Sequence, residues 1–467
     1  MNHDDIDSHI LEKYEIVERL GKGAYGIVWK VIHKKTKIVY ALKKICNAFA
    51  NPTDAQRTYR EIMYLQAFDG HENIVHLHKI IKAKNDKDIY ILLEYVESDL
   101  HHVIRAKILQ EKHIEYISYQ ILQAIKYMHA GEVIHRDIKP SNILVNPKCH
   151  VKLADFGLAR CALIQENDSN IVPLMTEYVA TRWYRAPEIL VGSTHYTKAT
   201  DMWAFGCVLA EMITGKVLFP GTSTLNQLEK ILEFTGYPSE EDIDDLEAPL
   251  AETILNSISV SKNKGMSSYF PEIPDVTLEF LKGLLQFNPN KRLTAEGALK
   301  HKFFARLREK FQDDEPVLNR AVYLHLDDDK KFPTKDYIIE LYNVIYKRKQ
   351  EERKKKKRQK LGSMNSDDNE NDEISSKSPS SSSQAMQSDD QPLERKITWA
   401  QYQYHKSVSS SGRTVGPFYN KQNTTGGLGK DKGQLFASGT LGPLGKHHSI
   451  FGHSMFSKGS KSLGFRK

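Results

Sequence analysis

One short stretch, residues 135–142, holds side chains that together could support transfer of a phosphoryl group. It reads HRDIKPSN. Asp137 could accept or orient the proton of an attacking hydroxyl group, and Lys139 could neutralise charge on the transferred phosphoryl group. Asn142 could offer an amide oxygen to Mg²⁺. A carboxylate and an amide at this spacing, with a lysine between them, are hard to explain as a chance feature of a surface loop.

A second acidic element, Asp155-Phe156-Gly157, follows the apolar stretch 151–154. A carboxylate at the end of a strand can hold Mg²⁺ against phosphate oxygens, because this hard cation prefers oxygen ligands. Asp155 and Asn142 are therefore the predicted metal ligands. The tripeptide Ala186-Pro187-Glu188 closes the segment that begins at Asp155, and the order of these elements along the chain is typical of phosphoryl-transfer enzymes.

A glycine-rich stretch, residues 21–28, lies between two predicted strands. Glycines at this spacing let backbone N–H groups approach phosphate oxygens without obstruction by side chains. An ordinary hairpin would also explain them, but no helix follows, which disfavours a dinucleotide fold and favours a phosphate lid. The residues of this stretch predicted to bind ATP are Leu20, Gly21, Lys22, Gly23, Ala24, Tyr25, Gly26 and Val28.

Lys43 lies on the next predicted strand, where its amino group could reach the α- and β-phosphates of ATP. A lysine within an apolar strand needs a partner of opposite charge if it is buried. Glu61, on the first predicted helix, is the obvious partner. Taken alone, Lys43 could equally be a solvated strand residue and Glu61 a surface charge.

The elements that must position these residues change character along the chain. Strand-like runs cover residues 14–20, 27–32, 39–45, 74–83 and 89–95, with one helix at residues 51–67. Proline at the first helical position supports that helix start. Helical patterns then dominate, at residues 114–129, 200–214, 224–234, 277–286 and 295–299. A strand-rich domain followed by a helix-rich one is the simplest interpretation.

The composition narrows the class of protein further. The chain has 467 residues, a net charge of +7 and 40% hydrophobic residues, and most of the positive excess falls late in the sequence. Residues 347–360 are almost continuously basic and residues 363–394 are rich in Ser, Asp and Asn, which is typical of disorder. The four cysteines are widely spaced, which fits a reducing compartment and disfavours a zinc site or a disulfide framework.

Residues 14–346 resemble eukaryotic protein kinases of the mitogen-activated (MAP) kinase group. The stretch 176–188, TEYVATRWYRAPE, is similar to the extracellular signal-regulated type, and residues 28–30, 53–58 and 219–228 are similar to its atypical seven/eight branch. The resemblance implies an α+β bilobal fold, with a small five-stranded antiparallel sheet and one helix in one lobe and a larger helical lobe. It also implies ATP and Mg²⁺ as cofactors, and a hinge at Glu94 and Val96 that binds adenine.

The predicted division of the chain follows from the motifs and this resemblance. It comprises an N-terminal extension (1–13), a kinase N-lobe (14–96), a C-lobe (97–304), a C-terminal extension packing on the kinase domain (305–346) and a disordered basic and Ser-rich tail (347–467).

The resemblance also implies a switch. Phosphate on Thr176 would add nearly two negative charges, which Arg57, Arg136 and Arg160 could bind with charge-assisted hydrogen bonds. Each of these arginines comes from a part of the molecule that must be aligned for catalysis. Pairing with surface carboxylates is the alternative interpretation of the three arginines.

Phosphate on Tyr178 would similarly find Arg182 and Arg185. The resemblance further implies substrates with Ser-Pro or Thr-Pro sites. Whether another enzyme or this one modifies Thr176 and Tyr178 stays open.

The main alternative to an active kinase is a protein that binds partners without catalysis. A pseudokinase scaffold would bind partners without transferring phosphate. Such proteins usually lack the lysine, the catalytic aspartate or a Mg²⁺ ligand, whereas this sequence has Lys43, Asp137, Asn142 and Asp155. We expect a monomer that acts on protein substrates, with partners that could bind the tail, and without a structural nucleic-acid or transmembrane role. The expected location is the cytoplasm, with the nucleus (from the basic run) and cilia or basal bodies (from the resemblance) as alternatives.

Overall fold

The computed structural model describes residues 6–23, 26–162, 182–260, 264–311, 318–328 and 330–364. Its first part is a five-stranded antiparallel sheet in the order β1-β2-β3-β5-β4. The strands are β1 (Tyr14–Gly23), β2 (Gly26–His33), β3 (Val39–Ile45), β4 (Leu77–Lys82) and β5 (Ile89–Glu94). Gly23 pairs with Gly26 at the end of the first hairpin, which places the glycine-rich stretch at the edge of the sheet. The predicted α+β fold, with its small antiparallel sheet, is confirmed.

Helix α2 (Pro52–Ala67) connects β3 to β4 and carries Glu61. The Asn51 side chain accepts the N–H of Asp54 at 2.9 Å, which satisfies one of the backbone donors that every helix start leaves open. Pro52 occupies the first turn, where its missing N–H does no harm. Most of the helix is buried, including charged residues, so its sides face other parts of the protein.

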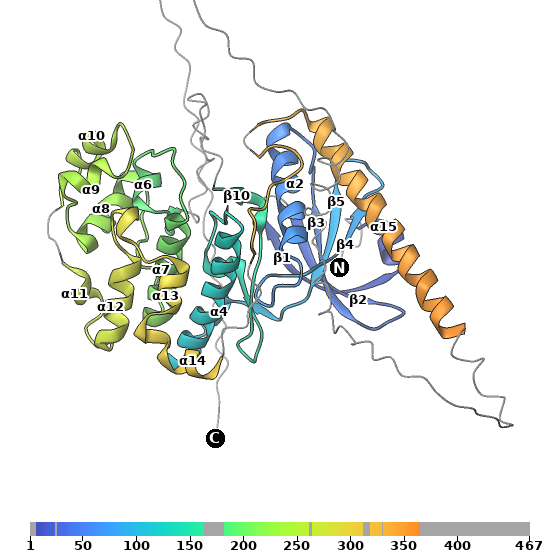
Figure 1. The fold of residues 1–467 in the computed structure, drawn as a ribbon, viewed down its shortest axis with the longest axis horizontal. Helices are drawn as coiled ribbons and strands as arrows, with labels where there is room; N and C mark the ends of the chain where they lie inside the picture. The colour runs from blue at the N-terminus through green and yellow to red at the C-terminus, as the bar shows by residue number, and fades with distance from the viewer. Residues whose placement is uncertain are drawn as a thin grey trace, which may run out of the picture. The chain divides into compact units, whose positions relative to one another are not determined.

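The second part of the structure is helical and lies beside the part that contains the sheet (Figure 1). Its long helices are α4 (Glu111–Ala130), α7 (Ala199–Thr214), α8 (Thr224–Thr235) and α12 (Asp275–Leu284). The shorter ones are α3 (Leu100–Arg105), α6 (Pro187–Leu190), α9 (Glu240–Asp244), α10 (Ala251–Asn256), α11 (Met266–Tyr269), α13 (Ala295–Leu299) and α14 (Ala305–Lys310). Fully buried aromatic side chains, among them Trp203, Phe205 and Phe280, fill the core between them.

Two small sheets hold the loops that carry the predicted catalytic residues. One has the order β6-β8-β9, from β6 (Ser98–Asp99), β8 (Ile143–Val145) and β9 (Val151–Leu153), and the other pairs β7 (Val133–Ile134) with β10 (Arg160–Cys161). Of these five strands, the sequence predicted only β9, which lies directly before the Asp155-Phe156-Gly157 motif. The other four have two or three residues, which is too short for a pattern of alternation.

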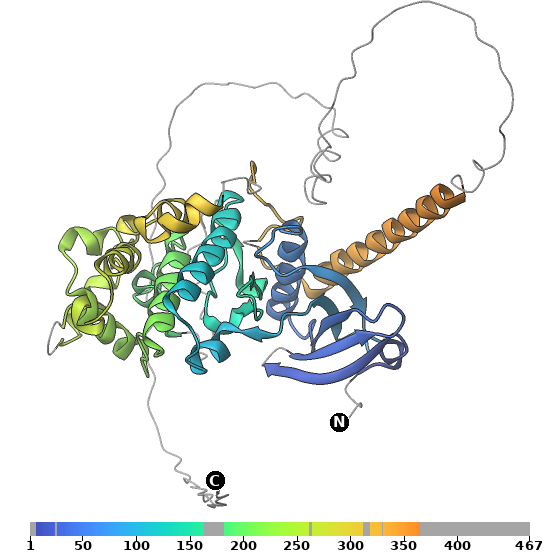
Figure 2. The same cartoon turned by 90° about the horizontal axis from the view of Figure 1, so that it is seen from below.

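The two ends of the described chain both pack on the sheet-containing part. Ile10 of helix α1 (Ser8–Leu11) and Ile6, just before that helix, pack against the sheet. Helix α15 (Thr334–Met364) packs against α2 and β4 and then extends past the sheet (Figure 2).

The end of α15 corrects one prediction. Residues 347–364, expected to be disordered, continue the helix. Lys, Arg, Gln and Glu are good helix formers, and a helix already nucleated by packing is extended at little further cost. The rest of the predicted tail, residues 365–467, lies outside the described residues. None of the helices that the structure describes is both long enough and apolar enough to cross a membrane.

Candidate active site

The loop after β7 is fixed by a single buried carboxylate. Asp201, at the start of α7, accepts the backbone N–H groups of His135 at 2.8 Å and Arg136 at 2.9 Å. His129 also contacts the same carboxylate at 2.9 Å. Arg136 has φ 67°, a left-handed conformation that is unfavourable for a residue with a side chain. The Asp201 carboxylate therefore stabilises a backbone conformation that the loop would not adopt by itself.

Asp137 lies at the centre of this loop. Its Oδ2 accepts hydrogen bonds from Lys139 Nζ at 2.7 Å and Asn142 Nδ2 at 3.0 Å, and its carbonyl accepts a second bond from Asn142 Nδ2 at 2.8 Å. Its Oδ1 is buried and has no hydrogen-bond partner among the described residues. A buried carboxylate oxygen without a partner is costly, which marks this oxygen as the acceptor for a group that arrives from outside.

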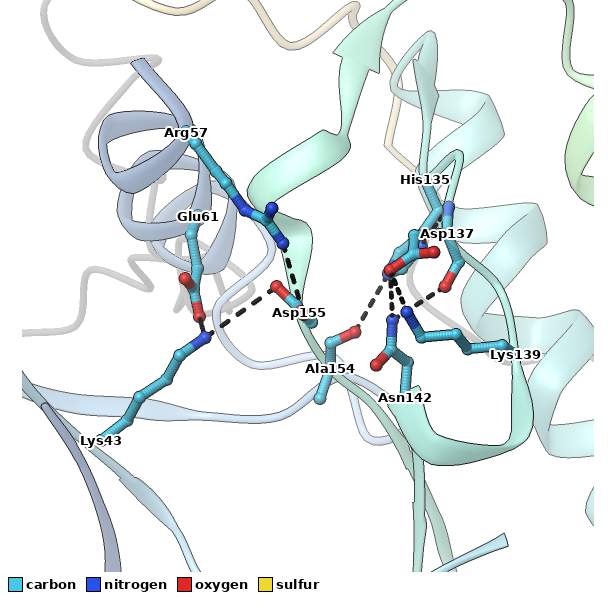
Figure 3. Close-up of polar contacts among 9 residues, drawn as sticks. All are labelled: Lys43, Arg57, Glu61, His135, Asp137, Lys139, Asn142, Ala154 and Asp155. Carbon is cyan, nitrogen blue, oxygen red and sulfur yellow. Dashed lines mark hydrogen bonds and ion pairs between the residues drawn. The ribbon is translucent and has the colours of Figure 1, made fainter. Parts of the chain in front are cut away.

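Asp155 faces this loop from the opposite side. Its backbone is left-handed, with φ 63° and ψ 73°, which directs the side chain toward the sheet. Lys43 Nζ lies 3.9 Å from Asp155 Oδ1 and also forms an ion pair with Glu61, while Arg57 Nη2 lies 4.0 Å from Asp155 Oδ2 (Figure 3). Asp155 thus stands between the cations of β3 and α2 on one side and the Asp137 loop on the other.

The charged groups of Lys43, Glu61, Arg57 and Asp155 stabilise one another in their ionised forms. Burial by itself would raise the pKa of Asp155, but Lys43 and Arg57 outweigh burial and hold the pKa of this carboxyl at about 2. Burial by itself would lower the pKa of Lys43, but Glu61 and Asp155 outweigh it and raise that pKa. Lys43 is therefore positively charged and Asp155 negatively charged at neutral pH, as binding of phosphate and of a divalent cation requires.

Lys43, Arg57, Glu61 and Asp155 line one cleft of about 990 Å³ between the sheet and the helical part, whereas Asp137 lines a separate small cavity. Its lining includes Leu20, Gly21, Lys22, Gly23, Gly26, Val28, Lys43, Arg57, Glu61, Glu94, Val96, Lys139, Asn142 and Asp155. Ala24 and Tyr25, also predicted to bind ATP, lie outside the described residues. The structure therefore brings every predicted ATP-binding residue that it describes to the same cavity.

The backbone N–H and the carboxylate of Glu94, which also lines this cleft, are already bonded to other residues of the protein. Its N–H donates to the His76 carbonyl at 3.0 Å, and its carboxylate accepts from His76 N–H at 2.7 Å and lies 3.1 Å from Lys152 Nζ. An adenine contact at Glu94 would therefore have to involve its backbone carbonyl.

The predicted metal ligands fit a divalent cation shared with phosphates. Asn142 uses its Nδ2 for both bonds to Asp137, so its amide oxygen points away from Asp137 (Figure 3). Asp155 offers a carboxylate held in its charged form. Among the residues described, no group of three or more His, Cys, Asp or Glu side chains could hold a metal by themselves. Two oxygen ligands from the protein with the remainder from phosphates and water is the usual arrangement for Mg²⁺.

The five predicted phosphate-binding arginines fall into different places. Arg57 lines the nucleotide cleft, whereas Arg136 and Arg160 line a separate cavity of about 730 Å³, where the Arg136 guanidinium lies 3.8 Å from the centre of the Tyr196 ring. Arg182 is buried and donates to the Thr222 carbonyl at 3.1 Å. Arg185 lines a small cavity that also contacts Arg136 and Asp137. Thr176 and Tyr178 lie outside the described residues.

Two features of the site were not found from the sequence. Asp99 and His102, which interact at 2.8 Å, line the outer part of the cleft, and their position just after the β5 strand was the signal that could have indicated them. Arg60, next to Glu61, forms a buried ion pair with Asp328 at 2.5 Å. No local pattern connects two residues so far apart in the chain.

Comparison with known proteins agrees with this geometry. Residues 14–304 match the model of the protein kinase domain. The chain is 55% identical over 350 residues to "Extracellular signal-regulated kinase 2" of Dictyostelium discoideum, covering 75% of this chain and 94% of that relative. It is 50% identical over 352 residues to "Mitogen-activated protein kinase 15" of Xenopus laevis, covering 75% of this chain and 59% of the relative.

A third relative extends the agreement. The chain is 46% identical over 349 residues to "Mitogen-activated protein kinase 15" of Caenorhabditis elegans, covering 74% of each protein. These relatives confirm the resemblance to MAP kinases that was inferred from residues 176–188, 28–30, 53–58 and 219–228. The chain belongs to the protein kinase family and, within it, to the MAP kinases, which are serine/threonine kinases.

Proposed function

We propose that this kinase transfers the γ-phosphoryl group of ATP to serine or threonine residues that precede proline, and that phosphorylation of Thr176 and Tyr178 activates it. The observation that carries the first part is the carboxylate of Asp137. One of its oxygens is fixed by Lys139 and Asn142, and the other is buried without a partner in the described structure.

The chemistry proposed at this carboxylate is a single displacement. The substrate hydroxyl oxygen forms a bond to the γ-phosphorus, and the bond from that phosphorus to the β–γ bridging oxygen breaks, which releases ADP. The hydroxyl proton passes to Asp137 Oδ1. Lys139, 2.7 Å from Asp137 Oδ2, stabilises negative charge on the moving phosphoryl group.

The other side of the cleft orients the nucleotide in this proposal. Lys43, which Glu61 holds by an ion pair, would bind the α- and β-phosphates. Asp155 and Asn142 would hold Mg²⁺, which when bound neutralises charge on the phosphates and aligns them. The glycines of β1 and β2 would cover the phosphates with backbone N–H groups, because no side chain blocks their approach.

Support for the proposed switch comes from the residues that follow the segment 163–181. Arg182 and Trp183 donate to the carbonyls of Thr222 and Gly221, both at 3.1 Å, so the chain just after Thr176 and Tyr178 is firmly attached to the helical part. Arg185 lies in one cavity with Arg136 and Asp137. Charges that bind a phosphorylated segment would therefore act directly beside the catalytic loop.

A pair of variants tests the proposed chemistry. Asp137→Asn should lower kcat by roughly 10²- to 10⁴-fold, the usual contribution of a general base, while ATP affinity stays nearly the same. Asp86→Asn, which removes an exposed carboxylate that pairs with Lys82, is the matched control. Phosphate transfer near the parental rate in Asp137→Asn would show that the assignment of the base is wrong.

A separate experiment tests the switch. The protein is purified from a host without MAP kinase cascades, and mass spectrometry follows phosphate on Thr176 and Tyr178 in the parent and in Asp137→Asn. Phosphate in the parent alone would show that the enzyme modifies itself, whereas phosphate in neither would point to an upstream kinase. Thr176→Ala should lower the activity of the phosphorylated enzyme severely, and an unchanged rate would contradict the proposed switch.

A further inference from the structure

A short segment that follows the kinase-domain match contacts both the helical part and the sheet-containing part. This strap, residues 318–328, first lies against the C-terminal end of α4. Val322 N–H donates to the Gly131 carbonyl at 2.8 Å. A Cβ atom on Gly131 would lie 2.9 Å from Leu318 Cδ1 and 3.0 Å from Val322 Cγ2, so a larger residue here would force these side chains of the strap to shift. Gly131 lies two residues before β7, which leads into the loop that carries Asp137.

The other end of the strap is bonded to α2. The Asp328 carboxylate accepts from Arg60 Nε at 2.5 Å and from the Tyr64 hydroxyl at 3.0 Å. The Asp328 carbonyl accepts from Arg60 Nη2 at 2.8 Å and from Gln56 Nε2 at 3.2 Å. Nearby, the Leu326 N–H donates to the Tyr59 hydroxyl at 3.1 Å.

The contact between Arg60 and Asp328 is nearly dry. Each of these two residues is only 5% exposed, and Tyr64 is fully buried. A buried ion pair with all its hydrogen bonds made adds little net stability, but it strongly disfavours any arrangement that separates the partners. It is therefore better suited to fixing the place of α2 than to holding the protein folded.

Helix α2 presents this contact and the active site on different faces. Gln56, Arg60 and Tyr64 recur every four residues and face the strap. Arg57 and Glu61, also four residues apart, lie on the adjoining face, about 100° around the helix, and point toward Asp155 and Lys43 (Figure 3). A rotation or shift of α2 that broke the first set of contacts would therefore also displace the second.

We propose that Asp328 is a positioning residue for phosphoryl transfer, which fixes α2 so that Glu61 and Arg57 meet Lys43 and Asp155. Because the strap also contacts Gly131, the same segment sets α2 relative to the end of α4 and the catalytic loop. This inference rests on the roles proposed above for Lys43 and Glu61.

The test compares two neighbouring carboxylates in the full-length, phosphorylated enzyme. Asp328→Asn keeps the shape but removes the charge that faces Arg60. Asp327→Asn is the matched control, because Asp327 pairs at 2.9 Å with Lys330, whose side chain is 73% exposed. Three quantities are measured for each variant: kcat and KM for ATP, hydrogen exchange of the α2 amides, and the thermal midpoint.

Asp328→Asn should lower kcat by about tenfold or more, because small displacements of catalytic groups have large effects on rate. Exchange should rise in residues 52–67 and much less in α7, a helix of the other part of the structure. Asp327→Asn should match the parent in all three measurements. Tyr64→Phe, which removes only one donor to Asp328, should give a smaller change in the same direction.

Several outcomes would overturn the inference. One is a parental kcat in Asp328→Asn with parental exchange in α2. Another is exchange that rises equally in α2 and α7, which would show a general loss of stability. If Asp328→Asn does not fold, Tyr64→Phe decides, and parental values for its kcat and its α2 exchange would refute the role. Because exchange does not depend on catalysis, it separates this inference from the proposed roles of Lys43 and Glu61.

Discussion

The Asp201 carboxylate accepts the backbone N–H of Arg136 at 2.9 Å, and this residue has a left-handed backbone with φ 67°. The same carboxylate accepts the N–H of His135, so two consecutive peptide groups of the catalytic loop are held by one side chain of α7. Burial alone would raise the pKa of Asp201, but its bond to His129 helps to lower the pKa of this carboxyl, which keeps it charged. The conformation of the loop thus depends on a residue far along the chain.

Asp201→Asn should therefore disturb catalysis as well as stability. The amide that replaces one carboxylate oxygen cannot accept an N–H, and loss of a hydrogen bond to a charged group is worth about 1.5–3 kcal/mol. We expect unfolding free energy to fall by that amount and kcat to fall at least tenfold, with KM for ATP little changed. Urea unfolding and steady-state kinetics measure the two effects, and a parental kcat would contradict the role of Asp201.

The buried pair of Glu188 and Arg292 gives a prediction about stability alone. Arg292 Nη2 and Nη1 bind the two oxygens of Glu188 at 2.6 and 2.7 Å. The Glu188 side chain is 2% exposed and the Arg292 side chain 0%. Glu188→Ala would leave the guanidinium buried without its anion, which typically costs about 3–5 kcal/mol. Chemical denaturation should show a loss of that size.

An exposed pair provides the control for that experiment. Glu296 and Lys300 are one helical turn apart with side chains 65% and 69% exposed, so Glu296→Ala should cost less than about 1 kcal/mol. Equal losses in the two variants would mean that burial of the Glu188 pair has no special effect.

Two glycines of the phosphate-covering hairpin should respond differently to substitution. A Cβ on Gly26 would lie 2.0 Å from the Lys44 carbonyl oxygen, whereas a Cβ on Gly21 would meet nothing within 4 Å. Gly26→Ala must therefore displace the backbone of β2 or β3, which should cost about 1–3 kcal/mol. Gly21→Ala should leave the thermal midpoint nearly unchanged. Differential scanning fluorimetry compares the variants, and equal midpoints would contradict the prediction.

Buried His71 should make folding weaker in mild acid. Burial lowers the pKa of His71 to about 4, below its ordinary value of 6.5, so the folded protein keeps this ring neutral where the unfolded chain would protonate it. Its contribution is therefore complete above about pH 6.5 and is lost as the pH falls toward 4, by up to roughly 3 kcal/mol. Urea unfolding at pH 7, 5.5 and 4.5 measures the loss.

The comparison with His71→Asn isolates this effect from that of the carboxylates. Asparagine can still accept the Asn73 N–H, which donates to His71 Nδ1 at 3.0 Å, but it does not titrate. The variant should lose less stability than the parent between pH 6.5 and 4. A His71→Asn variant whose stability shows the parental pH dependence would refute the prediction.

The sequence by itself determined the longer strands and helices and the order of the chemical groups. Residues 39–45 and 295–299 form the predicted strand and helix with the predicted bounds, because apolar periodicity and terminal residues are local signals. The motifs around Lys43, Asn142 and Asp155 indicated one nucleotide site, and the structure places these three side chains around one cleft. Residue type and spacing were sufficient here because phosphate and Mg²⁺ binding demand particular groups.

Only the tertiary structure decided how those elements are held. The sequence could not show that Arg60 pairs with Asp328, that Arg57 lies beside Asp155, or that the helix after Thr334 continues through the basic run. A charged residue on a helix has the same local pattern whether it faces water or a buried partner, and burial is set by contacts between distant segments. The placement of α2 therefore depends on its contacts with the strap, which no local sequence pattern indicates.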